Sequence, residues 1–436
     1  MPSEARAAAY RVIRRTFEQG AFTDRAFHTA AAALSARDRA LAQHLAYGTV
    51  QRRLTLDHVI ETVAGRPSAR IDAPLLAALR LGCFELLYAG SAAHAAVNDA
   101  VELVKRAHGH ALVNAVLRRV AREGRELVES LSDADPAGAS LAHSMPLWIT
   151  ERWWEALGGE GARSLLARIN EPAESALRAN TLRVEGAAAL IALLGVDARL
   201  GGEPPEAVVA LEPFDAYGSP LWRSGALMPQ SRASMMVAHC LEPAAGERVL
   251  DLCAAPGAKT THMAALMAAS GEVVAVERHA GRARALHRTA QRMGAANVTV
   301  EVSDATRPRR VAERFARVLV DAPCSGLGTL HSRPDLRWRV SADSVRALAE
   351  EQARLLSAAA TACAPGGRLV YSTCTVSVAE NEDQIGEFLD AHPDFEAVDL
   401  QASHPAWAHP RAPNVLLGLA DVQGSDGFFI AAFARV

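Results

Sequence analysis

The chain has 436 residues, half of them hydrophobic and 22% charged, and its net charge is −3. This length allows two or three domains, and the composition is ordinary for a soluble globular protein. Six cysteines without a Cys-x-x-Cys pair argue against a disulfide framework and a zinc site, so we expect reduced thiols.

The N-terminus, Met1-Pro-Ser-Glu-Ala-Arg6, has no apolar segment behind it, so we expect no signal peptide. No uncharged apolar stretch of about 18 residues occurs in the sequence, which predicts that the chain has no membrane span. The sequence therefore indicates a cytoplasmic protein.

Residues 1–130 contain no convincing strand. Their apolar residues recur at helical spacing, as in Leu75, Leu79 and Cys83, and this periodicity predicts an all-helical domain. The segment carries 18 Arg and Lys against 13 Asp and Glu, whereas the rest of the chain is acidic. A basic helical domain beside an acidic body suggests a module that binds a polyanion.

The polar, small-residue stretch 130–140 is typical of a linker. Residues 140–228 then mix helical patterns with short extended pieces, of which Ala176–Arg183 is one, and turns at Pro204-Pro205 and Gly218-Ser-Pro220. We expect a small α+β domain here.

Residues 229–436 show a regular alternation of apolar strands and helices. Helices are expected at Thr260–Ala269 and Arg282–Met293. The expected strands are Val249–Asp251, Val273–Glu277, Val298–Val300, Val318–Asp321, Leu369–Ser372 and Phe428–Phe433. Such an alternation with strands buried on both sides predicts an α/β domain built on a parallel, doubly wound sheet.

The loop Asp251–Thr261 follows the first of these strands and opens a helix, where doubly wound folds hold nucleotide-like ligands. It contains one glycine, so it is neither a dinucleotide fingerprint nor a P-loop. Glu277 and Asp304 follow the next two strands, where they are placed to bind ribose hydroxyls and an adenine amino group. An acidic pocket of this kind suits S-adenosylmethionine, whose sulfonium and amino group are cationic.

Two further loops each place a cysteine just past a buried strand. These are Asp321-Ala-Pro-Cys324, after Val318-Leu-Val320, and Ser372-Thr-Cys374, after Leu369-Val-Tyr371. A thiolate attacks electron-poor carbon at neutral pH and also leaves well. Two thiols at one sheet edge therefore suit a reaction that makes and later breaks a covalent bond to its substrate.

Several motifs together resemble the RNA cytosine-5 methyltransferases of the Sun/Fmu (RsmB) type. In the C-terminal domain they are Asp251–Lys259, Asp321–Gly328, Arg333–Trp338, Tyr371–Thr375 and Glu380–Glu382. The helical segment is similar to a NusB-like RNA-binding domain through Leu79–Leu87, Ala96–Lys105 and Val113–Arg118. Arg178–Arg183 resembles the start of the family's middle domain and Asp426–Phe429 its terminal strand.

The resemblance implies three domains: a NusB-like helical RNA-binding domain (1–130), a small α+β RNA-binding domain (140–228) and a Rossmann-like class I methyltransferase domain (229–436). It further implies methylation of carbon 5 of a cytosine in 16S ribosomal RNA. The implied contacts to S-adenosylmethionine are Cys253, Ala254, Ala255, Pro256, Gly257, Ala258, Lys259, Glu277, Asp304 and Asp321. Ala258 stands where the family usually has a second glycine, and Glu277 where aspartate is usual.

By the same resemblance Cys374 attacks carbon 6 of the cytosine, Cys324 helps to release the product, and Asp321 steadies the base. DNA cytosine-5 methyltransferases instead attack with the cysteine of the Pro-Cys motif, so the residues alone leave the two roles interchangeable. Lys259 and Arg337 are candidate contacts to the cofactor or the RNA backbone, with a solvated charge as the alternative for Arg337. Trp338 fits a core residue better than a platform for stacking a base.

Three alternatives stay open: the same chemistry on transfer RNA or large-subunit ribosomal RNA, a non-catalytic NusB-like RNA-binding factor, and a nicotinamide dehydrogenase. The missing glycine fingerprint disfavours the dehydrogenase, and the intact cysteine and cofactor motifs disfavour the non-catalytic factor. The histidines lack the spacing of metal ligands, so no metal is assigned, and we expect a monomer.

Overall fold

The computed structural model describes residues 2–307 and 314–436, and these residues form two compact units. The first unit comprises Met1–Pro172 and Leu330–Arg339, and the second comprises Ala173–Thr329 and Val340–Val436. The expected boundaries near residues 130, 140 and 228 remain predictions about domains; the division into compact units falls at Pro172. None of the helices in the described part of the chain has both the length and the apolar character needed to cross a membrane.

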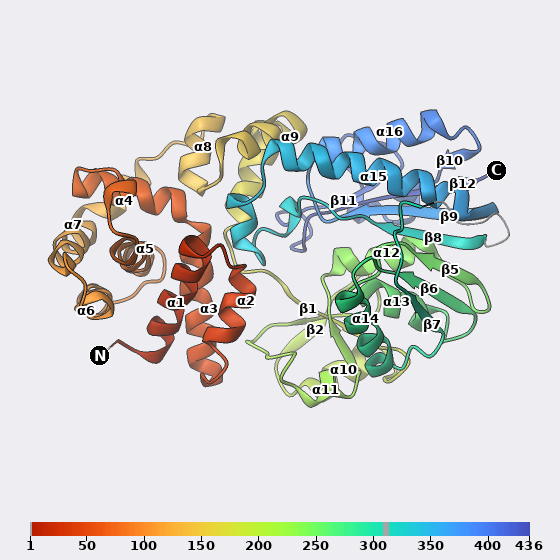
Figure 1. The fold of residues 1–436 in the computed structure, drawn as a ribbon, viewed down its shortest axis with the longest axis horizontal. Coiled ribbons are helices and arrows are strands. Elements are labelled where there is room, and N and C mark those ends of the chain that lie inside the picture. Colours follow the sequence, from red (N-terminus) through yellow and green to blue (C-terminus); the bar gives the residue numbers. More distant parts are fainter. Residues whose placement is uncertain (1, 308–313) are drawn as a thin grey trace. The chain divides into compact units, whose positions relative to one another are not determined.

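The first unit is helical, as the periodicity of residues 1–130 predicts (Figure 1). Its helices are α1 (Glu4–Glu18), α2 (Thr23–Ala30), α3 (Ala36–Gln51), α4 (Arg53–Ala64), α5 (Ala73–Leu87), α6 (Ala93–Val104), α7 (His110–Glu129), α8 (Pro136–His143) and α9 (Leu147–Arg168), with short 3-10 turns η1 (Ser68–Arg70) and η3 (Pro334–Trp338). Leu75, Leu79 and Cys83 are buried in one aliphatic core with residues of the other helices. Removing this apolar surface from water is the main source of the unit's stability.

The segment Leu330–Arg339 returns from late in the sequence to pack into this helical unit. Arg337 is fully buried there and donates hydrogen bonds to the carbonyl oxygens of Gln51 (3.2 Å) and Ser144 (3.2 Å) and to Asn170 Oδ1 (2.9 Å). The Trp338 indole donates to the carbonyl of Val50 at 2.8 Å. Both predictions for Arg337, a ligand contact and a solvated charge, are therefore wrong, because its guanidinium pairs with backbone carbonyls inside the first unit.

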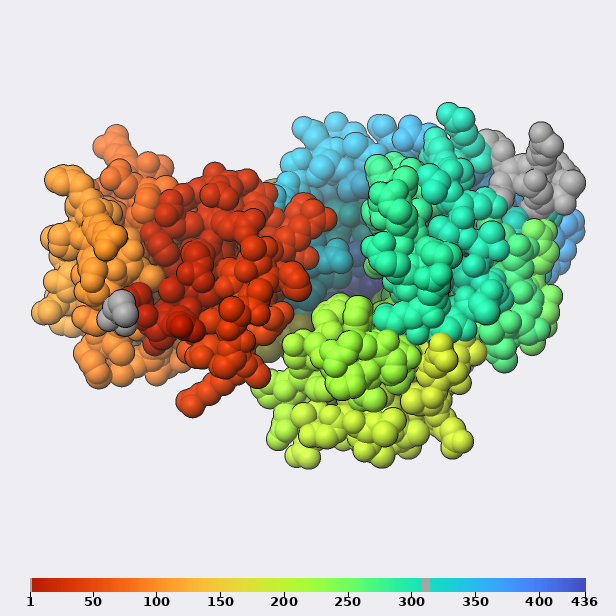
Figure 2. Space-filling model, turned by 60° about the horizontal axis from the view of Figure 1, so that its bottom comes forward, coloured from red at the N-terminus to blue at the C-terminus, as the bar shows by residue number. Residues whose placement is uncertain are grey.

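The second unit begins with a small antiparallel sheet in the order β2-β3-β1-β4. Its strands are β1 (Ser175–Ala179), β2 (Ala198–Leu200), β3 (Ala207–Ala210) and β4 (Leu227–Pro229), accompanied by α10 (Ala187–Leu194) and α11 (Pro220–Arg223). Leu177, Leu190, Val208 and Leu227 form its core. The mixed α+β character expected for this stretch is present, and in Figure 2 its yellow-green surface adjoins the green helices of the same unit.

The large sheet has the order β10-β12-β9-β8-β5-β6-β7, with β11 paired to β12. Its strands are β5 (Arg248–Asp251), β6 (Glu272–Val276), β7 (Val298–Glu301), β8 (Phe315–Asp321), β9 (Cys363–Thr373), β10 (Phe395–Ala397), β11 (Leu416–Gly418) and β12 (Phe428–Arg435). Strands β5 to β9 are parallel, whereas β10, β11 and β12 pair antiparallel. The expectation of an entirely parallel sheet is wrong at this edge, because a strand buried on both faces carries no mark of its direction.

Helices cover both faces of this sheet (Figure 1). They are α12 (Arg232–Leu241), α13 (Ala258–Leu266) and α14 (Ala280–Met293) on one face and α15 (Ala342–Ala362) and α16 (Glu382–Ala391) on the other, with the short elements α17 (Leu400–Ser403), η2 (Leu327–Thr329), η4 (Val378–Glu380) and η5 (Pro405–Trp407) in the connections. Because β5, β6, β8 and β9 run parallel, the loops after their carboxyl ends gather at one edge of the sheet.

Candidate active site

The loop after β5 turns sharply into α13. Gly257 occupies the N-cap position of that helix with φ +104°, a conformation that residues with a side chain rarely adopt. A Cβ atom at Gly257 would also come within 2.6 Å of the Leu286 side chain. The loop is held from behind, since the Ala254 N–H donates to the Val276 carbonyl (3.0 Å) and Arg282 donates to the Ala255 carbonyl (2.8 Å). The glycine is thus required by its backbone conformation and by the close packing of α14.

Two buried carboxylates flank this loop. Asp251 Oδ2 accepts a hydrogen bond from the Thr260 hydroxyl at 2.7 Å, whereas Oδ1 is buried without a partner among the described residues. Burial raises the pKa of Asp251 to about 7. Glu277 is also buried, accepts from the His279 N–H (2.8 Å) and pairs with Arg282 (3.4 Å). The orphaned oxygen of Asp251 is an acceptor suited to a cationic or hydroxyl-bearing ligand.

Asp304 differs from these two carboxylates because it is exposed. It accepts hydrogen bonds from the Thr306 hydroxyl (2.7 Å) and the Thr306 N–H (3.0 Å), and these bonds lower its pKa. Its contact with an adenine amino group therefore stays a prediction.

The two cysteines meet at the ends of neighbouring parallel strands. β8 and β9 pair with Asp321 opposite Ser372, and the loops that follow bring Cys324 Sγ and Cys374 Sγ to 3.3 Å. The Cys374 N–H also donates to Cys324 Sγ at 3.3 Å. The hydrogen bond with Cys374, followed by burial, raises the pKa of Cys324 well above its ordinary value, so Cys324 holds its proton.

Asp321 links the loop Asp251–Thr261, called the cofactor loop after its predicted ligand, to the cysteine loops, which follow β8 and β9 and carry Cys324 and Cys374. Its Oδ2 accepts from Lys259 Nζ at 2.8 Å, and its Oδ1 accepts from the Ser372 hydroxyl at 3.0 Å. The Lys259 ammonium also sits 4.6 Å from the centre of the Phe428 ring. Lys259 therefore ties the first turn of α13 to the strand end that carries Asp321.

Glu380 is a buried residue of this site that the sequence analysis quoted only as part of a motif. Its Oε1 accepts from the Ser325 N–H (2.8 Å) and from Gln352 Nε2 (3.2 Å), and its Oε2 accepts from the Ser325 hydroxyl (2.5 Å). That hydroxyl also lies 2.7 Å from Thr375 Oγ1. One carboxylate thus fixes the residue after Cys324 and, through it, the residue after Cys374.

Asn381 holds the loop that carries Cys374 by hydrogen bonds on both sides of the cysteine. Its Oδ1 accepts from the Thr373 hydroxyl (2.6 Å), and its Nδ2 donates to the Thr375 carbonyl (3.0 Å), so it brackets Cys374. The Tyr371 hydroxyl donates to the Glu380 carbonyl at 2.6 Å. The motif Glu380-Asn381-Glu382, in which an amide lies between two acidic residues, was the available signal for this role.

The two cysteine loops are also joined through their backbones. The Gly328 N–H donates to the Cys374 carbonyl (3.0 Å), and the Gly427 N–H donates to the Gly328 carbonyl (2.7 Å). A Cβ atom at Gly328 would come within 2.1 Å of the Gly427 carbonyl oxygen. Glycine at position 328 is therefore needed for this close approach of two chain segments.

Arg178 is a second residue whose role the sequence did not reveal. It lies on β1, is fully buried, and donates to the Ala258 carbonyl (2.8 Å) and to Thr261 Oγ1 (3.0 Å). Burial lowers its pKa to about 9. The small sheet thereby supports the start of α13, directly behind the cofactor loop.

Comparisons with known proteins show which families and chains this chain resembles. A family described as 16S rRNA methyltransferase RsmB/F matches residues 238–434, and the NusB family matches residues 3–122. A probable ribosomal RNA small subunit methyltransferase B of Synechocystis sp. is 35% identical over 98% of both chains. The ribosomal RNA small subunit methyltransferase B of Thermus thermophilus is 37% identical over 92% of this chain and 89% of its own. A methyltransferase homologue of Pyrococcus horikoshii, whose crystal structure is known, is 28% identical and has a TM-score of 0.62, covering 69% of this chain and 99% of its own.

Proposed function

Because the chain belongs to the RsmB/F family of 16S rRNA methyltransferases, we propose that it methylates carbon 5 of a cytosine in 16S ribosomal RNA through a covalent cysteine adduct. Its expected class, a helical NusB domain with a Rossmann-like methyltransferase, is confirmed by both family matches. The proposal of carbon-5 methylation through a cysteine adduct rests on the Cys324–Cys374 pair, whose sulfur atoms lie 3.3 Å apart beside Asp321.

S-adenosylmethionine is the methyl donor of this family, and when bound it supplies an electrophilic methyl group on its sulfonium. The residues present fit this donor. Asp251 offers an unpartnered buried oxygen and Glu277 a buried carboxylate. The turn 253–257 has small side chains that permit close approach of a ligand to the backbone. We assign the donor to the end of β5, held by Cys253 to Lys259, Glu277, Asp304 and Asp321.

Carbon 5 of cytosine is a poor nucleophile, so the ring needs activation. In the proposed reaction the Cys374 thiolate forms a bond to carbon 6, and the ring electrons move toward carbon 5. Carbon 5 then accepts the methyl group, and Asp321 holds the N3/N4 edge of the base. Loss of the proton from carbon 5 to a base restores the ring double bond and expels the Cys374 sulfur.

Cys324 is placed to accept that proton late in the reaction. In the free enzyme the hydrogen bond with Cys374, burial and the charge of Cys374 together raise the pKa of Cys324. Once Cys374 is a neutral thioether, its charge and its side-chain hydrogen bond no longer raise the pKa of Cys324, whereas burial and the charge of Glu380 still do. Cys324 then releases its own proton to solvent more readily, and the resulting thiolate takes the carbon-5 proton at the stage at which the adduct must break down. This order of events fits Cys374 as the nucleophile, the role that the family resemblance implies for it.

The target cytosine must leave its stack to reach two thiols at a sheet edge. We propose that the basic helical unit and the small sheet choose the RNA, since RNA recognition depends mainly on shape and single-stranded elements. Binding through arginines predicts an affinity that falls as salt rises.

The direct test is bisulfite mapping of ribosomal RNA from cells with and without this protein. We expect one cytosine of 16S rRNA to lose its protection when the gene is deleted and to regain it with the wild-type chain but not with Cys374→Ser. If protection changes only in transfer RNA or 23S rRNA, the substrate assignment is wrong. If no cytosine changes, the proposed chemistry is wrong.

A further inference from the structure

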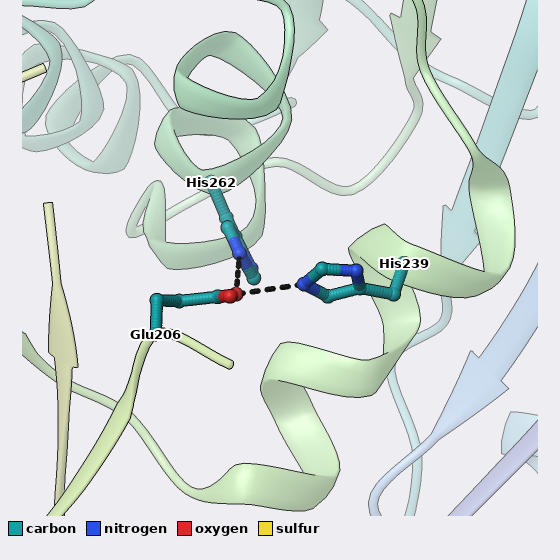
Figure 3. A group of neighbouring side chains, drawn as sticks. All are labelled: Glu206, His239 and His262. Atoms are coloured by element: carbon teal, nitrogen blue, oxygen red, sulfur yellow. Dashed lines mark hydrogen bonds and ion pairs between the residues drawn. The ribbon is translucent and has the colours of Figure 1, made fainter. Parts of the chain in front are cut away.

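Glu206, His239 and His262 form a compact group on three different elements of the second unit (Figure 3). Glu206 directly precedes β3, His239 lies in the last turn of α12, and His262 lies on α13. Figure 3 shows both imidazole rings directed at the same carboxylate. His239 Nε2 lies 2.8 Å from Glu206 Oε1, and His262 Nε2 also contacts that oxygen. Residues 23 or more positions apart in the sequence thus present one donor atom each to a common point.

The group is mostly buried, and its His239 side chain is partly exposed to solvent. The His262 and Glu206 side chains are 2% and 7% exposed, whereas the His239 side chain is 24% exposed. The Nδ1 atom of His262 has no hydrogen-bond partner among the described residues, and its Nε2 meets the same Glu206 oxygen that His239 faces. A buried imidazole nitrogen without a partner costs free energy, and one carboxylate oxygen shared by two imidazoles is a crowded arrangement that a bound cation would relieve.

We propose that Glu206, His239 and His262 bind a divalent transition-metal ion of the zinc class. Two imidazoles and one carboxylate are donors that such ions prefer, and three protein ligands leave a fourth position for water. The three donor atoms lie within 4.8 Å of one another. A tetrahedral ion bound at about 2.1 Å from each would set them roughly 3.3 Å apart, so small side-chain rotations complete the site.

A positive charge, the Arg178 guanidinium, acts electrostatically on His262 and would repel a bound cation. Its charge is engaged at Ala258 and Thr261, and the Glu206 carboxylate supplies a compensating negative charge within the group itself. The carboxylate therefore makes the site able to accept a cation beside a buried arginine.

A metal here would join the small sheet, α12 and α13. His262 lies one turn after Lys259, which contacts Asp321 at the candidate active site. The ion would thus hold the helix that begins at the cofactor loop, and its effect is structural. The folded chain gains stability with metal concentration, because the assembled ligands exist only in the folded state.

The site can be tested on the full chain after removal of metal with a chelator. Titration with Co²⁺ is followed by the visible ligand-field absorption, and Zn²⁺ is then added as the competitor. The variants are His239→Gln and Glu206→Gln, with His287→Gln on α14 as the matched histidine control. Cys374→Ser tests whether the thiol pair is the ligand instead. Circular dichroism of the metal-free proteins shows whether each variant is folded.

We expect one equivalent of Co²⁺ in the wild type, His287→Gln and Cys374→Ser. Loss of a direct ligand should weaken binding at least tenfold in His239→Gln and Glu206→Gln, since even outer partners of metal ligands are worth about 10 to 100-fold. Zn²⁺ should raise the melting temperature of the first three proteins only. Equal binding in all folded variants, loss of binding in Cys374→Ser, or no binding by the wild type would overturn the site and leave a hydrogen-bonded triad.

Discussion

Replacement of Glu380 by glutamine should loosen the loop that carries Cys324. The carboxylate accepts three hydrogen bonds, two from Ser325 and one from Gln352. A bond to a charged acceptor contributes about 1 kcal/mol more than a neutral one, so Glu380→Gln should cost this loop about 3 kcal/mol. Since about 1.4 kcal/mol is a factor of ten, the loop should open roughly a hundredfold more often.

The direct measurement is amide hydrogen exchange of the peptide that contains Ser325, because its N–H donates to Glu380. We expect exchange at this amide to speed up roughly a hundredfold in Glu380→Gln. Formation of the denaturant-resistant RNA adduct should slow at least about tenfold, because misplacement of reacting groups by about 1 Å is costly. Glu387→Gln, an exposed change on α16, is the matched control and should alter neither.

The reasoning fails if exchange at Ser325 is unchanged while adduct formation slows. Glu380 would then act on the reaction itself and would not hold the loop. Unchanged values for both measurements would show that the backbone bonds of Gly328 suffice to place Cys324.

Four further outcomes follow from the geometry. Cys374→Ser should abolish methyl transfer in a tritiated-methyl assay, whereas Cys324→Ser should accumulate a denaturant-resistant RNA adduct visible by gel shift; activity of Cys374→Ser would reverse the two roles. Asp321→Asn should lower kcat at least about 100-fold in that assay, a loss typical of a group that acts on the reacting base. A thiol oxidant such as diamide should join the two cysteines, whose sulfurs lie 3.3 Å apart against about 2.05 Å in a disulfide; mass spectrometry should show a loss of two hydrogens, and reductant should restore activity. Burial raises the pKa of Asp251 to about 7 from 3.8, so between these two pH values the folded chain retains a proton that the unfolded chain releases. The free energy of unfolding should therefore fall as pH rises from about 4 to about 7. Urea unfolding of Asp251→Asn should lack this dependence on pH.

Much of the second unit could be predicted because its signals are local. Short apolar runs bounded by polar turns predicted β5 to β9 to within a few residues, except that β8 and β9 begin earlier. Parallel strands place their carboxyl ends together, which is why Cys324 and Cys374 could be paired from sequence alone. Their order along the chain and the polar residues after each strand carried this information.

The features that could not be predicted depend on contacts between distant segments. In the sequence, Arg337 cannot be told from an ordinary surface arginine. Only the folded first unit brings the carbonyl oxygens of Gln51 and Ser144 to its guanidinium. His239 and His262 show no metal-ligand spacing, because the fold and not the local sequence brings them to Glu206. Pattern analysis detects periodicity within an element, and these three cases arise between elements.

The helix α13 links these observations. Its first turn is fixed by Arg178 from the small sheet and by the Lys259–Asp321 pair from β8, and its second turn presents His262 to Glu206. The position of its first two turns is therefore fixed by contacts with Arg178, Asp321 and Glu206. Asp251, at the end of the preceding strand, keeps a buried oxygen without a partner among the described residues. A rigid loop with an unsatisfied acceptor is prepared for a ligand, since little ordering entropy is lost when the ligand binds. The small sheet thus supports the loop to which we assign the methyl donor, through a buried arginine that binds the backbone of α13.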